Sequence, residues 1–222
     1  MKILAFEFSS NLRSVAVVDD GRACGRAQEA GPRASRALGL VESALREAGL
    51  ERERVDCLAV GLGPGSYTGI RSAIALAQGW QLALGTRILG ISSVECLAAV
   101  AHSEKILGRV NVVIDAQRKE FYLAGYEIGA AGWQEVEPLR LAGMDDVRAL
   151  ADHGETVIGP DAAQWFPAAR MLFPDAAILG QLALRRRDFF SGERLEPIYL
   201  RAPAFVKAPP PRILPTPDTN DE

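Results

Sequence analysis

The sequence predicts an α/β fold in which the chain forms two successive halves. Strand-like and helix-like patterns alternate in the order β-β-β-α-β-α-β-α, and an apolar strand-like run near residue 110 then starts a second half. Hydrophobic residues make up 48% and charged residues 24% of the 222 positions, as in an ordinary globular chain. We therefore expect subdomains at residues 1–105 and 106–201, followed by a mobile, proline-rich acidic tail at 202–222.

Three strands are expected to open the first half. They cover residues 2–9, 13–19 and 22–28. The Asp20-Gly21 pair between the last two is typical of a tight hairpin turn. The opening strands should therefore pair in antiparallel fashion.

A helix is expected next, at residues 34–49. Leu38, Val41 and Leu45 recur there at three- and four-residue steps, and Gly49 ends the pattern. The remaining elements expected in this half are a strand at 55–62, a helix at 69–84, a strand at 87–91 and a helix at 93–101.

The second half is expected to begin with strands and end with helices. Its expected strands lie at 110–116, 120–128 and 155–159, with a turn at 129–132. Helical patterns follow at 162–173 and 176–190, and we expect the second of these helices to pack back on the first subdomain.

A glycine-rich turn precedes the helix at 69–84. Glycines at positions 61, 63, 65 and 69 permit backbone angles and close approaches that a side chain would block. Ser66 or Thr68 can cap the helix by accepting a bond from a free backbone N–H. Two interpretations stay open: phosphate binding at the helix N-terminus, and a tight strand-to-helix connection. The glycines are not followed by the Lys-Ser or Lys-Thr dipeptide that a phosphate-binding Walker loop requires.

The helix after this turn has almost no polar face. Between residues 71 and 84 its polar residues are Arg71, Ser72, Gln78 and Gln81. These interruptions argue against a membrane span, which needs about 20 apolar residues in succession. A helix that is apolar all round is covered either by its own fold or by a second chain.

Charge and cysteine content exclude several classes of protein. The net charge of −3 argues against binding nucleic acid by bulk electrostatics. The first residues lack the apolar core of a secretory signal, so we expect a cytoplasmic protein. Cys24, Cys57 and Cys96 are odd in number and widely spaced, which indicates reduced core residues rather than disulfides or metal ligands.

Four segments carry a resemblance to a known family. They are ILAFEFSS at 3–10, GLGPGSYTGIR at 61–71, VIDAQRKEFY at 113–122 and EPIYLR at 196–201. Together with the element order they resemble the actin-like ATPase (ASKHA) superfold, in which two similar subdomains flank a nucleotide cleft. Each subdomain of that superfold has a mixed sheet and flanking helices. Within it, these segments are similar to the TsaB family, also called YeaZ.

The resemblance implies a non-catalytic subunit rather than a complete enzyme. Members of this family pair with the TsaD transferase and, with the small ATPase TsaE, attach threonylcarbamoyl to the adenosine beside the anticodon of tRNAs that read codons starting with A. They lack the metal-binding histidine pair of TsaD, and His102 and His153 show no ligand spacing here. The resemblance thus implies no catalytic residue, no metal, no cofactor, no membrane, and contact with tRNA only through the complex.

The resemblance also implies a dimer surface formed by the first two helices, here those at 34–49 and 69–84. This surface serves TsaB–TsaD pairs and, in isolation, TsaB homodimers. The residues expected there are Leu38, Val41, Leu45, Arg71, Ile74 and Gln78. A charged residue in place of Ile74 is expected to abolish pairing and to leave the protomer folded.

Two further features have more than one interpretation. Glu7 stands where members of the family usually carry Asp. Glu7 and Asp115 either hold a metal and phosphate, or they accept hydrogen bonds from backbone N–H groups at strand ends. Arg185 to Arg187, with Arg201 and Lys207, form either a weak contact to the tRNA backbone or a solvated helix end. The alternative functions are an independent actin-like ATPase or small-molecule kinase and, less favoured, an M22-type protease.

Overall fold

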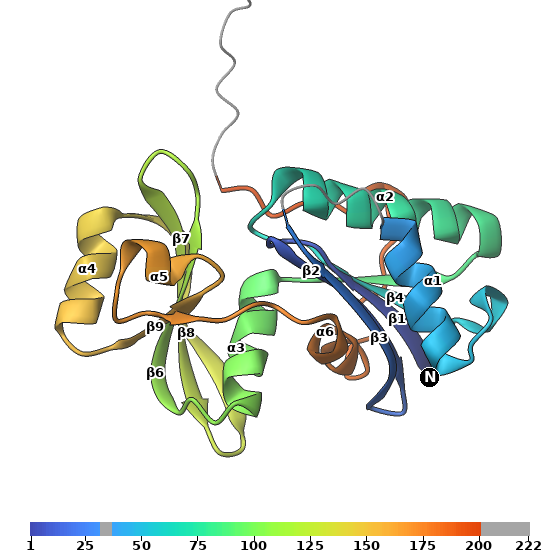
Figure 1. Ribbon diagram of the computed structural model, residues 1–222, viewed down its shortest axis with the longest axis horizontal. Coiled ribbons are helices and arrows are strands. Elements are labelled where there is room, and N and C mark those ends of the chain that lie inside the picture. The colour runs from blue at the N-terminus through green and yellow to red at the C-terminus, as the bar shows by residue number, and fades with distance from the viewer. Residues whose placement is uncertain (32–36, 201–222) are drawn as a thin grey trace, which may run out of the picture.

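Both halves of the chain form a five-stranded mixed sheet with the same strand order. The computed structural model describes residues 1–31 and 37–200. The two sheets lie in separate lobes, and one helix, α3 (Ser93–Ser103), stands between them (Figure 1).

The first sheet is ordered β3-β2-β1-β4-β5. Its strands are β1 (Lys2–Glu7), β2 (Leu12–Asp19), β3 (Arg22–Ala30), β4 (Cys57–Gly61) and β5 (Arg87–Ile91). β1 runs antiparallel to β2 and parallel to β4. Asp20 and Gly21 both have positive φ, 45° and 83°, so the predicted hairpin turn between β2 and β3 is confirmed.

The second sheet is ordered β10-β9-β6-β7-β8. Its strands are β6 (Gly108–Asp115), β7 (Glu120–Gly129), β8 (Gly132–Gly143), β9 (Thr156–Gly159) and β10 (Arg170–Met171). β6 runs antiparallel to β7 and parallel to β9, just as β1 runs antiparallel to β2 and parallel to β4. The strands of the two sheets therefore correspond one to one. This duplicated mixed sheet confirms the predicted actin-like fold.

Helices cover both faces of each sheet. Besides α3 they are α1 (Ala37–Ala48), α2 (Tyr67–Leu84), α4 (Met144–Asp152), α5 (Ala162–Trp165) and α6 (Ala176–Ala183). α1 and α2 share one hydrophobic core with the first sheet, and α6 and part of α3 pack on its other face. α3 also packs on the second sheet, whose outer face carries α4 and α5. The two lobes are therefore joined through the layer that holds α3 and α6 (Figure 1).

The predicted helix at 162–173 is wrong. α5 ends at Trp165, and Phe166 is extended with φ −129° and ψ 101°. Pro167 explains the break, because the residue before a proline is disfavoured in the α conformation. The following segment contributes only the short strand β10.

The predicted helix at 176–190 is too long. α6 ends at Ala183, and Phe190 instead pairs with Ile88 of β5. The sequence patterns did not anticipate β8 or α4. Positions 34–36 of the first predicted helix, the predicted tail, Arg201 and Lys207 all lie outside the described residues.

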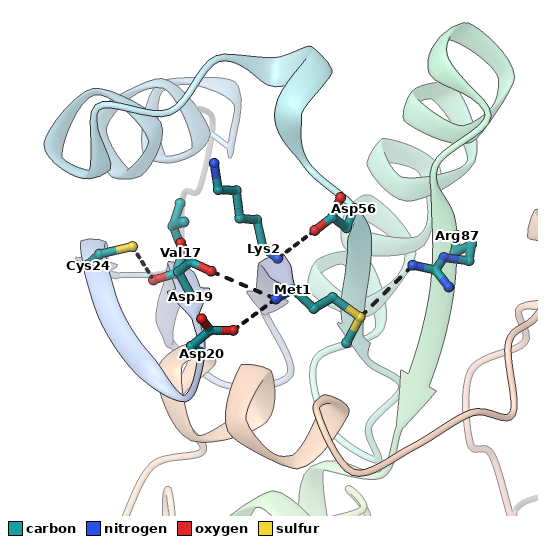
Figure 2. Close-up of polar contacts among 8 residues, drawn as sticks. All are labelled: Met1, Lys2, Val17, Asp19, Asp20, Cys24, Asp56 and Arg87. Atoms are coloured by element: carbon teal, nitrogen blue, oxygen red, sulfur yellow. Dashed lines mark hydrogen bonds and ion pairs between the residues drawn. The ribbon is translucent and has the colours of Figure 1, made fainter.

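The amino terminus ties three parts of the first sheet together (Figure 2). The Met1 amino group donates to Asp20 Oδ1 at 3.0 Å, and Lys2 N donates to Asp56 Oδ2 at 2.8 Å. Cys24 lies nearby and donates to the Val17 carbonyl, but it is exposed. The prediction of three core cysteines is therefore wrong for Cys24, because it lies on the outer strand β3; the other two are buried.

Candidate functional site

The glycine-rich turn is built against the end of β1. A Cβ at Gly65 would lie 2.1 Å from the Ser9 carbonyl oxygen, and one at Gly69 would lie 2.0 Å from that of Phe8. Ser66 caps α2 by accepting a hydrogen bond from Gly69 N at 3.3 Å. The structure thus confirms a tight strand-to-helix connection, which brings the N-terminus of α2 against the loop after β1.

Replacing Gly69 with alanine is expected to destabilise the protein by about 2 to 3 kcal/mol, because the new methyl group meets a backbone oxygen that cannot move aside. Gly79 in the same helix is the matched control. Nothing lies within 4 Å of a Cβ at Gly79, so alanine there should stabilise the helix by about 0.5 to 1 kcal/mol. Urea unfolding of both variants measures the difference, and equal effects would contradict the close approach.

A cleft of about 580 Å³ lies between the lobes beside this turn. The loop after β1, the N-terminus of α2 and the end of β6 line it, and its charged side chains are Arg13, Asp115 and Asp161. Asp115 Oδ1 accepts a hydrogen bond from Gln117 N at 2.7 Å. Partial burial and the neighbouring Asp115 raise the pKa of Asp161.

Glu7 does not face this cleft. Its side chain is 0% exposed; Oε1 accepts from Ser9 N at 2.8 Å and Oε2 accepts from Ser93 Oγ at 2.9 Å. Of the two interpretations, acceptance of bonds at strand ends is confirmed for Glu7 and Asp115. Glu7 therefore offers no carboxylate to a metal or phosphate in this cleft.

Burial raises the pKa of Glu7 above its ordinary value of 4.5, and the hydrogen bonds from Ser9 and Ser93 oppose this shift. Between 4.5 and the raised pKa the folded protein therefore binds more protons than the unfolded chain, so its free energy of unfolding falls as pH rises. Glu7→Gln lacks this titration. We expect the parent to lose stability relative to Glu7→Gln as pH rises through that window, measured as urea midpoints of both proteins. Parallel pH profiles would show that Glu7 does not titrate this way.

The six predicted interface residues fall on opposite sides of α1 and α2. Leu38, Arg71 and Gln78 are exposed, and for them the interface stays a prediction. The other three, Val41, Leu45 and Ile74, are buried in the core between these helices and the first sheet. For these three the prediction is wrong, because their side chains already pack within the protomer.

One exposed stripe runs along α2. It consists of Tyr67, Arg71, Ala75, Gln78 and Leu82, and we call it the α2 stripe. Arg71 lies over the Tyr67 ring at 4.2 Å, and Gln78 Nε2 donates to the Gly192 carbonyl at 2.9 Å. Leu82 is 90% exposed. Sequence reasoning missed Leu82, although helical steps from Arg71 and Gln78 lead to it.

The two histidines lie on different helices. His102 is in the last turn of α3 and His153 follows α4, and both lie outside the cleft lining. Within residues 1–31 and 37–200, no three His, Cys, Asp or Glu side chains gather as metal ligands.

None of the helices in the described part of the chain has the length and hydropathy needed to cross a bilayer.

Comparison with known proteins decides the family. The family model TsaD, described as tRNA N6-adenosine threonylcarbamoyltransferase, matches residues 32–196. The tRNA threonylcarbamoyladenosine biosynthesis protein TsaB of Escherichia coli K12 is 30% identical over 220 residues, which cover 90% of this chain and 95% of that protein. The chain belongs to the TsaB family.

Two other members support the assignment over both lobes. TsaB of Haemophilus influenzae is 26% identical and the match covers 80% of this chain and 83% of that one. The structure of YeaZ from Pseudomonas aeruginosa superposes with a TM-score of 0.76 at 30% identity, covering 90% of this chain and 99% of that chain. The TsaB fold is therefore present here over nearly its full length.

Proposed function

We propose that this chain is a non-catalytic subunit that pairs with a TsaD-type transferase and acts together with a TsaE-type ATPase. The complex would attach threonylcarbamoyl to the adenosine beside the anticodon in tRNAs that read codons starting with A. The observation that carries the proposal is the 30% identity to TsaB over 90% of the chain. In this scheme the chain works in the cytoplasm, meets tRNA through the complex and supplies no catalytic, metal-binding or cofactor-binding residue.

We place the pairing surface on the outer faces of α1 and α2. Four of the ten exposed large apolar side chains among the described residues lie on these helices: Leu38, Tyr67, Leu82 and Leu84. A partner that covers these helices would remove such side chains from water, which favours association. The same face would join two copies of the chain when the TsaD-type subunit is absent, since homodimers use one surface twice.

Reconstitution tests the proposal. The chain is mixed with the TsaD-type and TsaE-type proteins of its own organism, tRNA, ATP and an activated threonylcarbamoyl donor, and modified adenosine in tRNA is measured with each subunit omitted in turn. We expect modification only when all three are present. Modification without this chain would overturn the proposal, and ATP turnover by the isolated chain would favour the alternative of an independent ATPase.

A further inference from the structure

A second cavity, of about 380 Å³, lies between α3, α6 and the turn that joins β7 to β8. Among the described residues, none lines both this cavity and the cleft. The cavity lies where α6 of the first lobe meets α3 and the second lobe (Figure 1). Its volume falls within the range of small-molecule sites, about 300–1,000 Å³.

The three consecutive arginines at the end of α6 have different surroundings. Arg186 Nη2 donates to Glu95 Oε1 at 2.7 Å, and Arg187 Nη1 donates to the Leu184 carbonyl at 3.0 Å. Arg185 has no ion pair or side-chain hydrogen bond with any described residue, and it lines the cavity. Only Arg185 of the three therefore offers its guanidinium to a ligand there.

Two aromatic side chains, His102 and Trp133, also line the cavity. The rings of His102 and Trp133 lie 5.5 Å apart at an interplanar angle of 52°. His102 Nε2 lies 3.4 Å from the Ala130 carbonyl oxygen in the turn that joins β7 to β8. Ile178 and Leu182 of α6 add apolar surface. A flat ring can stack on one of these two rings and meet the other at its edge, since every nucleobase has a face that stacks on aromatic side chains.

We propose that this cavity binds a nucleotide, with the base against Trp133 and His102 and the phosphate on Arg185. A planar ring that carries an anionic group satisfies both the two aromatic rings and the unpaired guanidinium, whereas an apolar ligand would leave Arg185 unused. Arginine binds phosphate through two parallel N–H donors, which suits this position. The nucleotide is either free or an unpaired residue of an RNA.

Calorimetric titration of the full-length chain with AMP, adenosine and inorganic phosphate tests the proposal. We expect saturable binding of AMP, and binding of adenosine or phosphate alone weaker by about tenfold or more, because each lacks one of the two contacts. A short unpaired oligoribonucleotide is the second probe. Tighter binding of the oligonucleotide, in competition with AMP, identifies RNA as the source; binding of AMP alone identifies a free nucleotide.

Arg185→Gln should weaken AMP binding about tenfold or more. Arg187→Gln is the matched control and should leave it unchanged, because Arg187 donates to backbone carbonyls and lies outside the cavity lining. Trp133→Leu should weaken binding of AMP more than that of phosphate, with circular dichroism to check folding. Arg185 is exposed, so Arg185→Gln should fold like the parent. It therefore tests the proposed site even if Trp133→Leu fails to fold. Absence of saturable binding by either probe, or equal binding by Arg185→Gln and the parent, overturns the proposal.

Discussion

Replacing Leu82 with glutamate is expected to weaken pairing with the TsaD-type subunit about 100-fold or more and to leave the protomer folded. The Leu82 side chain is 90% exposed, so the substitution removes almost no contact within the protomer. Surface substitutions of this kind change the free energy of unfolding by about 0.5 kcal/mol or less. In an apolar interface, however, the new carboxylate would lose its hydration without gaining a partner.

Size-exclusion chromatography with light scattering on an equimolar mixture measures this loss, and the same column reports self-pairing of the isolated chain. Leu107→Glu is the matched control. Leu107 is 55% exposed between α3 and β6, away from α1 and α2, so the same change of chemistry should leave pairing intact. A heterodimer that survives Leu82→Glu at low micromolar concentration would contradict the pairing surface proposed for α2.

The first sheet could be predicted from local patterns. β5 spans the residues expected for it, and the other strands of this sheet begin and end within two residues of the predicted bounds. Gly49 ends the first helix with φ 58°, as its sequence position indicates. These features depend on neighbouring residues alone, such as the apolar runs of the inner strands and the turn-forming pair at Asp20 and Gly21.

The strand β8 escaped prediction because it has little apolar patterning. β8 is an outer strand of the second sheet and exposes many of its side chains, so it lacks the apolar run of a buried strand. Pro138 inside it also argues against a strand by local rules, although prolines are tolerated on edge strands. In the segment at 162–173 the apolar spacing favours a helix, but Pro167 disfavours the α conformation at Phe166 and ends the helix there.

The direction in which a uniformly apolar helix faces could not be predicted from sequence. α2 has apolar residues on nearly every side, so periodicity does not say which side meets the sheet. Contacts between distant segments determine it: Ser66 N donates to the Ser9 carbonyl at 2.7 Å, and Gly69 packs against Phe8. These contacts turn Ile70, Ala73, Ile74 and Ala77 inward and leave the α2 stripe outside. The cleft and the burial of Glu7 depend on the same long-range packing.

Ile74→Asp is therefore expected to unfold the protomer rather than to act on pairing alone. Ile74 is only 6% exposed and belongs to the core between α1, α2 and the first sheet. Truncating a buried isoleucine costs about 2 to 5 kcal/mol, and a buried carboxylate without a partner adds a further penalty. The total, about 4 kcal/mol or more, is a large part of the typical stability of 5 to 15 kcal/mol.

Soluble yield and the thermal transition followed by circular dichroism measure this effect. Ile74→Val is the matched control, because it keeps the position apolar and should cost only about 0.5 to 1.5 kcal/mol. A cooperative transition of Ile74→Asp near that of the parent would mean that Ile74 faces outward in solution. Leu82 and Ile74 are only about two helical turns apart on α2. If Leu82→Glu loses pairing while Ile74→Asp loses folding, the outer face of α2 serves the partner and its inner face serves the core.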